Sequence, residues 1–187
     1  MVSRVYVEKK PGFDVEARAL AHELQSILGI EGLESVRLLN RYDAEGMSEE
    51  LFAQCVPTVF SEPQSDEVSS ELPVAEGEVV FAVEPLPGQF DQRADSASEC
   101  IQLISQGERP LIRNARVYIL GGELSEADID AIKHYVINPI EAREAALDVP
   151  ETLKLEQPKP EMVESIEGFL DFTREELDAQ WEFVAKM

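Results

Sequence analysis

The sequence predicts an α/β protein in which one β-α-β-α-β unit occurs twice, over residues 1–72 and 79–148. The first observation is an internal repeat whose partners keep a nearly constant separation along the chain: Val7 with Val83, Glu8 with Glu84, Pro11 with Pro87, Gly12 with Gly88, Phe13 with Phe90, Asp14 with Asp91, Ala17 with Ala94 and Ser48 with Ser125. The second is that alternating apolar segments, typical of strands, take turns with apolar residues at helical spacing. Because such small units bury little surface alone, we expect the two to share one core.

The predicted elements of the first unit are, in order, strand 2–7, helix 15–28, strand 33–42, helix 49–55 and strand 58–60. Asp14 and Ser48 are predicted N-caps, because each precedes an apolar helical pattern and can accept a hydrogen bond from a free backbone N–H. Pro57 is expected to end the second helix. Residues 61–78 contain many Pro, Ser, Glu and Asp residues, so this stretch is predicted to be a connector.

The predicted elements of the second unit are strand 78–83, a helix capped by Asp91, strand 112–120, a helix capped by Ser125 and strand 136–140. Ser125 with Asp128 approximates a capping box. From residue 149 a Pro-rich linker leads to helical pieces that run to residue 187. Because an apolar helical stripe is still running at the last residue, we expect a longer polypeptide.

The charge balance is strongly acidic, with 38 acidic and 16 basic residues and a formal net charge of −22. No Lys/Arg cluster is present, which argues against binding to nucleic acid or to an anionic membrane surface. The acidic surface either promotes solubility or docks onto a basic partner. Cys55 and Cys100 are expected to be buried free thiols, and with no signal peptide or apolar span we expect a cytoplasmic protein.

Residue chemistry alone predicts no catalytic residues and no metal site. His22 and His134 lie in different units without the spacing of metal ligands. Gly121-Gly122 is a candidate anion-binding turn, but Glu123 and Glu126 beside it disfavour phosphate. An independent small enzyme is therefore the least favoured interpretation.

Several segments resemble the N-terminal region of the single-chain form of phosphoribosylformylglycinamidine (FGAM) synthase. They are residues 5–14, 40–43 and 45–46 for its opening, 136–141 for the end of its second repeat, and 172–177 for the start of its helical linker domain. The resemblance implies two PurS-like units fused into a pseudo-dimer, with a two-layer α+β fold. It implies a largely antiparallel sheet with helices on one face, followed by a short helical segment.

The resemblance also implies a role in purine biosynthesis. The parent enzyme is a ligase that uses ATP and glutamine to amidate formylglycinamide ribonucleotide, with ATP and Mg²⁺ bound in the parent enzyme and no cofactor in this fragment. Its synthetase and glutaminase domains lie further along the polypeptide, so neither Cys55 nor Cys100 corresponds to the glutaminase nucleophile. The chain itself is expected to be inactive.

The implied role is that of a non-catalytic assembly domain that bridges the remaining synthetase and glutaminase domains of the same polypeptide. The residues predicted to make these interdomain contacts belong to a turn and to a strand: Lys9, Lys10, Pro11, Gly12, Asn40, Arg41, Tyr42 and Asp43. Ordinary turn chemistry explains the same residues equally well. The alternative function is a stand-alone regulatory module that binds a small metabolite between its halves.

Overall fold

A computed structural model of the chain describes residues 1–154, 172–175 and 177–178. Met1–Lys154 forms one compact unit, and Leu155–Met187 forms a second. In the second unit, 174–175 and 177–178 are helical, and the Leu177 backbone N–H donates to the Thr173 carbonyl at 3.0 Å. The predicted linker at 157–160 and most of the predicted C-terminal helix lie outside the described residues.

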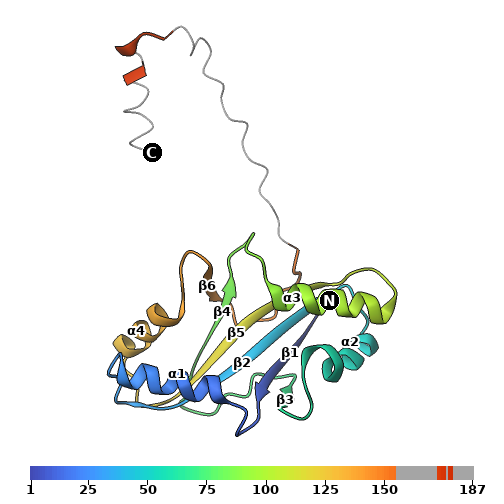
Figure 1. The fold of residues 1–187 in the computed structure, drawn as a ribbon, viewed down its shortest axis with the longest axis horizontal. Helices are drawn as coiled ribbons and strands as arrows, with labels where there is room; N and C mark the ends of the chain where they lie inside the picture. The colour runs from blue at the N-terminus through green and yellow to red at the C-terminus, as the bar shows by residue number, and fades with distance from the viewer. Residues whose placement is uncertain (155–171, 176, 179–187) are drawn as a thin grey trace. The chain divides into compact units, whose positions relative to one another are not determined.

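The compact unit has an α+β fold with a six-stranded antiparallel sheet and four helices (Figure 1). Its elements are β1 (Val2–Lys9), α1 (Val15–Ser26), β2 (Leu33–Glu45), α2 (Glu49–Cys55), the π-helical turn η1 (Val56–Phe60), β3 (Asp66–Ser69), β4 (Val79–Pro85), α3 (Gln92–Ser105), β5 (Leu111–Gly122), α4 (Glu126–Val136) and β6 (Ala142–Ala145). The strand order is β3-β1-β2-β5-β4-β6, so β2 and β5 join the two halves at the centre. No helix of the described residues is long and apolar enough to cross a membrane.

The strand register of one half is repeated in the other at the offset of the sequence repeat: Tyr6 pairs with Arg41 and Ser69, and Ala82 pairs with Val117 and Ala145. In the central β2–β5 pair, Asn40 lies opposite Arg116, and the same offset separates these two residues. The register is therefore two-fold symmetric about this residue pair. Any side chain at this position lies at the middle of the sheet.

The helices form two separate pairs on the same face of the sheet (Figure 1). At one end, α1 and α4 pack over a core that contains Leu24, Phe81, Leu120 and Ile132. At the other end, α2, η1 and α3 pack over a core that includes Val5, Tyr42, Phe60 and Ile101. Each core is completed by strands from both halves of the chain. The expectations of an antiparallel sheet and of helices on one face are confirmed.

The opposite face of the sheet carries a third apolar cluster without a helix among the described residues to cover it. Its buried members are Tyr6, Leu39, Ala82, Val117, Ile119 and Ala145. Leu72 and Leu147, from the segments that follow β3 and β6, pack against this cluster. Residues 146–153 therefore continue the compact unit beyond the predicted end of the second repeat at 148.

The third strand of the first half is not where the sequence pattern predicted it. Residues 58–60 belong to η1, because Pro57 occupies the first turn of that element, where its missing N–H leaves no hydrogen bond unmade. The third strand of this half is β3, which lies inside the predicted connector 61–78. It is an edge strand of the sheet and pairs with β1. An edge strand is held by backbone hydrogen bonds, which do not depend on apolar side chains. A polar edge strand such as β3 therefore has no apolar pattern from which it could be predicted.

The last strand also differs from the prediction. Residues predicted as strand 136–140 instead contain the end of α4 and a turn, and β6 begins at Ala142. Ser48, Asp91 and Ser125 each accept the expected capping hydrogen bond. Asp14 precedes α1 but does not cap it, because its carboxylate accepts a hydrogen bond from the Gly12 backbone at 2.9 Å.

Candidate functional site

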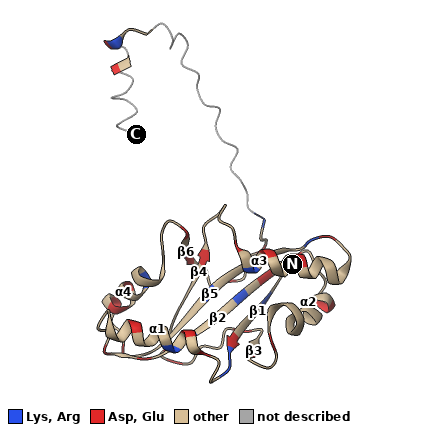
Figure 2. Cartoon of the chain, viewed as in Figure 1, with Lys and Arg blue, Asp and Glu red and all other residues tan. Residues whose placement is uncertain are grey.

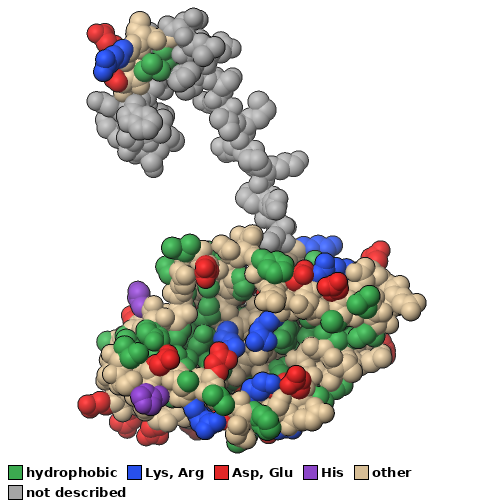
Figure 3. Space-filling view, in the orientation of Figure 1, with side chains coloured by type: hydrophobic (Ala, Val, Ile, Leu, Met, Phe, Trp, Pro, Cys, Tyr) green, Lys and Arg blue, Asp and Glu red, His purple; other side chains and the backbone are tan. Residues whose placement is uncertain are grey.

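A cleft of about 990 Å³ separates the two helix pairs on the helix-bearing face of the sheet. Figure 3 shows it as a hollow near the middle of this face, with basic and acidic side chains inside. A smaller cavity of about 430 Å³ adjoins it, shares Tyr42, Val59 and Arg93, and reaches Cys100. The cleft lies over the symmetric centre of the sheet, because Asn40 and Arg116 both line it.

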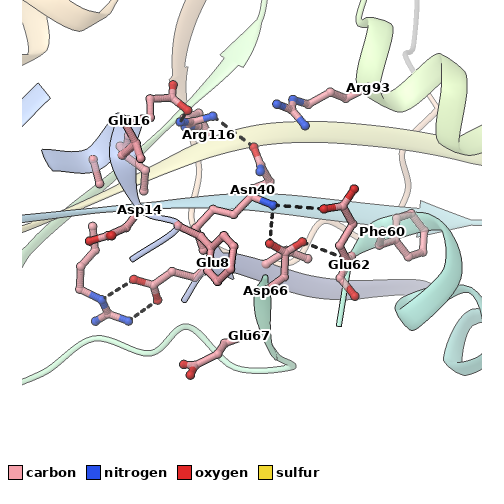
Figure 4. A pocket seen from close by; sticks show the side chains of 18 of the residues that line it. Glu8, Asp14, Glu16, Asn40, Phe60, Glu62, Asp66, Glu67, Arg93 and Arg116 are labelled. Carbon is pink, nitrogen blue, oxygen red and sulfur yellow. Dashed lines mark hydrogen bonds and ion pairs between the residues drawn. The ribbon is translucent and has the colours of Figure 1, made fainter. Parts of the chain in front are cut away.

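Both halves of the chain build this cleft (Figure 4). The first turns of α1 supply one wall, and η1 supplies the apolar residues Val59 and Phe60 on the other side. Arg93 extends into the cleft from the first turn of α3, and Arg116 rises from β5. The volume is in the range of small-molecule sites, and the lining combines apolar walls with a few polar groups.

Most charged side chains in the cleft are already paired. Arg116 forms an ion pair with Glu16 at 2.5 Å, and its other contact is Asn40 Oδ1 at 3.4 Å. Lys9 lies 2.6 Å from the Asp66 carboxylate. Burial raises the pKa of Asp66, but hydrogen bonds from Lys9 and from the backbone outweigh burial, so the pKa lies below its usual value. By contrast, Arg93 has no ion pair or hydrogen bond within residues 1–154.

A second polar cluster lies on the opposite face of the sheet, where Arg4 and Arg41 flank Asp43. Arg41 and Asp43 are only 4% and 2% exposed. Arg4 binds both carboxylate oxygens of Asp43, and Arg41 Nε lies 3.3 Å from Oδ2 without the alignment of a hydrogen bond. Burial lowers the pKa of Arg41, whereas for Arg4 the Asp43 contacts outweigh burial and the pKa is raised.

These arginines also hold the segment that follows β6. Arg4 donates to the Leu147 and Asp148 carbonyls, Arg41 to the Ala146 carbonyl, and Arg113 to the Leu153 carbonyl. Glu45 accepts from the Leu153 N–H and the Thr152 hydroxyl. Residues 146–153 are thus fixed across the sheet by buried or half-buried side chains.

The predicted contact residues fall into three groups. Lys9, Pro11, Asn40 and Tyr42 line the cleft. Lys10 and Gly12 lie in the adjacent turn, where Lys10 donates to the Pro63 carbonyl at 2.6 Å and Gly12 has a positive φ of 94°. Arg41 and Asp43 lie on the other face, inside the buried cluster. The structure therefore brings four of the eight together and separates Arg41 from Tyr42, because neighbours in a strand point to opposite faces.

Sequence analysis missed Glu16, Arg93 and Arg116 in the cleft. One signal could have found the first two. Glu16 and Arg93 are separated along the chain by the same offset that relates Asp14 to Asp91, so they occupy equivalent places in the two halves. Arg116 is separated by the repeat offset from Asn40, a predicted contact residue, but its place directly opposite Asn40 depends on the strand register.

Other candidates from the sequence have structural explanations. His22 and His134 are exposed and contact Ser26 and the Asp130 carbonyl, respectively. The described residues contain no group of three or more His, Cys, Asp or Glu placed to hold a metal ion. Gly122 lies against the backbone of Gly32, where close packing leaves no space for an anion.

The two cysteines differ, contrary to the prediction that both are buried. Cys55 is fully buried, and burial raises the pKa of its thiol, whereas Cys100 is exposed on α3. We expect a thiol reagent such as dithionitrobenzoate to label Cys100 rapidly and Cys55 only after unfolding, at least about 100-fold more slowly. Cys100→Ser should remove the fast phase. Two fast phases in the folded protein would contradict the burial of Cys55.

Acidic residues are spread over all four helices (Figure 2), and six acidic residues within 1–154 line the cleft: Glu8, Asp14, Glu16, Glu62, Asp66 and Glu67. The cleft combines polar side chains with apolar walls, which suits the binding of a small molecule better than covalent chemistry. The sequence matches no protein-family model and no curated protein.

Proposed function

We propose that residues 1–154 form the PurS-like assembly domain of a single-chain FGAM synthase. In this proposal, two duplicated units form a fused pseudo-dimer that bridges the synthetase and glutaminase domains further along the polypeptide. Amidation of formylglycinamide ribonucleotide, with its need for ATP, Mg²⁺ and glutamine, takes place in those domains. The present chain contributes binding surfaces and no catalytic residues.

The observation that carries the proposal is the constant offset in strand register between the halves. A fused pair of identical units predicts such an offset in every equivalent strand pair, together with a seam at a two-fold centre. The sequence repeat from Val7 to Gly12 has the same offset. The agreement of sequence repeat and strand register supports duplication, which the resemblance to FGAM synthase also implies.

Two equivalent turns supply candidate docking surfaces. Phe13 follows Pro11-Gly12 and is 57% exposed, while Phe90 follows the matching Pro87-Gly88 turn and is 74% exposed. A second exposed apolar residue accompanies each aromatic ring: Val15 beside Phe13, and Ile140, whose carbonyl accepts from Gln89, beside Phe90. Exposed aromatic groups with apolar neighbours are typical of protein interfaces. Two such surfaces suit a domain that contacts two catalytic domains.

Complementation in trans tests this function. Residues 1–187 would be mixed with a single-chain FGAM synthase that lacks its own N-terminal region, and glutamine-dependent amidation would be measured. We expect the chain alone to hydrolyse neither glutamine nor ATP, and the mixture to recover amidation. Glutamine hydrolysis by the isolated chain, or a mixture no more active than the truncated synthase, would contradict the proposal.

Substitution of the exposed phenylalanines locates the surfaces. Phe13→Ser and Phe90→Ser should each weaken association with the truncated synthase about tenfold or more, since aromatic anchors dominate interface energies. Leu103→Ser is the matched control, because Leu103 is 72% exposed but lies near the end of α3, outside both turns. Thermal melting of all three variants should stay close to that of the unchanged chain. Equal binding by the three variants would exclude the turns as interfaces.

A further inference from the structure

The charged side chains of the cleft are arranged asymmetrically, although the strand register beneath them is two-fold symmetric. Glu16, in the first turn of α1, and Arg93, in the first turn of α3, are repeat-equivalent residues of opposite charge. Glu16 is already paired with Arg116 on the floor of the cleft. Arg93 extends into the cleft from α3, and its guanidinium has no ion-pair partner within residues 1–154 (Figure 4).

Three hydrogen-bond donors in the cleft lack partners within residues 1–154. They are the Arg93 guanidinium, the Asn40 side-chain amide nitrogen and the Tyr42 hydroxyl. Tyr42 and Arg93 line both the cleft and the adjoining cavity, so these two donors are near the junction of the two spaces, whereas Asn40 lines the cleft only. Donors that line one cleft without an acceptor favour a ligand with acceptor oxygens.

The charges limit that ligand to a single negative charge. Glu16 balances Arg116, and Asp66 balances Lys9, so Arg93 contributes the remaining positive charge at this end. Glu62, which lies 3.8 Å from Lys9, and Glu67 also line the cleft and would repel a second negative charge. Although the chain has 38 acidic and 16 basic residues, Arg93, which lines the cleft and is exposed to solvent, has no carboxylate partner within residues 1–154. A planar carboxylate matches the fork of a guanidinium.

The remaining walls are apolar. Val15, Val59, Phe60 and the ring of Tyr42 line the space around the donors. A ligand that fills about 990 Å³ while bound by one charged group needs an apolar body to contact these walls. We propose that this cleft binds a small metabolite with one carboxylate and an apolar body, the carboxylate lying against Arg93, Asn40 and Tyr42. Binding of this ligand does not require the assembly function proposed above, although Phe13 and Val15 of the first turn surface also line the cleft.

The test uses residues 1–187 and two probes, phenylacetate and N-acetylphenylalanine, each compared with its uncharged amide. Binding would be followed by isothermal titration and by the labelling rate of Cys100, which lines the adjoining cavity. We expect saturable millimolar or tighter binding of the acids, slower labelling of Cys100, and little response to the amides. Phenyl phosphate, which carries a second charge, should bind more weakly. Absence of saturable binding by both acids, or equal binding of acid and amide, would overturn the proposal.

Three variants connect binding to the named residues. Arg93→Gln should reduce affinity about tenfold or more, because it removes a charged hydrogen bond. Arg109→Gln is the control, since Arg109 is a part-exposed arginine paired with Asp95 outside the cleft, and its affinity should not change. Glu16→Gln frees Arg116 and should tighten binding several-fold. If Arg93→Gln bound as well as the control, or Glu16→Gln weakened binding, the carboxylate would not lie at Arg93.

Discussion

Asp43→Ala is expected to lower the free energy of unfolding by about 3–5 kcal/mol, because it removes the one carboxylate between two buried guanidinium groups. Arg4 would then keep backbone carbonyls and the Tyr6 hydroxyl as acceptors, and Arg41 would keep the Ala146 carbonyl, but neither would have a carboxylate. Both side chains are 5% exposed, so water cannot replace the lost charge without opening the sheet. Urea denaturation followed by circular dichroism measures the loss as a lower midpoint.

Three controls separate the buried charge from other effects of the substitution. Asp95→Ala removes an exposed ion pair to Arg109 and should cost less than about 1 kcal/mol. Asp43→Asn keeps the shape of the side chain but removes its charge, so it should still cause most of the loss in unfolding free energy expected for Asp43→Ala. Arg41→Met should cost less than Asp43→Ala, because Arg4 and Asp43 stay paired and the Arg41 Nε that lacks a hydrogen bond is removed. If Asp43→Ala cost no more than Asp95→Ala, the cluster would not be a buried charge network.

The sequence pattern was sufficient to predict most of the main helices and strands and their order along the chain. The repeat from Val7 to Gly12 fixes equivalent strands and turns, and strands such as β2 and β5 contain enough alternating apolar residues to be visible. Ser48, Asp91 and Ser125 cap helices through local hydrogen bonds, which depend only on neighbouring residues. These features could be predicted because each depends on residues that are close together in the sequence.

The edges of the sheet could not be predicted in the same way. β3 and β6 are short and polar, and backbone hydrogen bonds to β1 and β4 hold them in place. The helix α2 ends at Cys55, before Pro57, as expected, but the predicted strand 58–60 is part of η1, whose Phe60 packs against Tyr42 at 5.0 Å between ring centroids. Tertiary packing therefore overrides the local signal at this point.

In the candidate site, too, some features could be predicted from the sequence of one strand and others depend on the pairing of distant strands. Alternation along β2 already implies that Tyr42 faces one side and Arg41 the other, although both were assigned to one contact surface. The pairing of Arg4 with Asp43, and of Arg116 with Asn40, follows only from the strand register. A single sequence carries no direct signal for register between distant strands, so neither the buried cluster nor the floor of the cleft was predictable.

Gly122→Ala is expected to destabilise the seam between the halves by about 3 kcal/mol or more. Gly122 has a φ of +127°, which side chains other than glycine's hydrogen rarely allow, and a Cβ there would lie 2.1 Å from the Gly32 carbonyl oxygen. The close approach results from the register shift between Leu33 and Ser35, a β-bulge at the end of the central strand pair. Urea denaturation would give the loss, and faster amide exchange should appear first at this end of β2 and β5.

Substitution of two other glycines separates the two causes of this effect, the positive φ and the close approach of the added Cβ to the backbone. Gly88→Ala introduces a Cβ at a φ of +92° with nothing within 4 Å, so it should cost only the conformational strain, about 1–2 kcal/mol. Gly32→Ala has no positive φ, but its Cβ would lie 2.0 Å from the Glu123 carbonyl oxygen, so it tests the close approach alone. Gly122→Ala combines both causes and should exceed either single effect. If Gly122→Ala cost no more than Gly88→Ala, then β2 and β5 would not approach so closely at this end of the sheet.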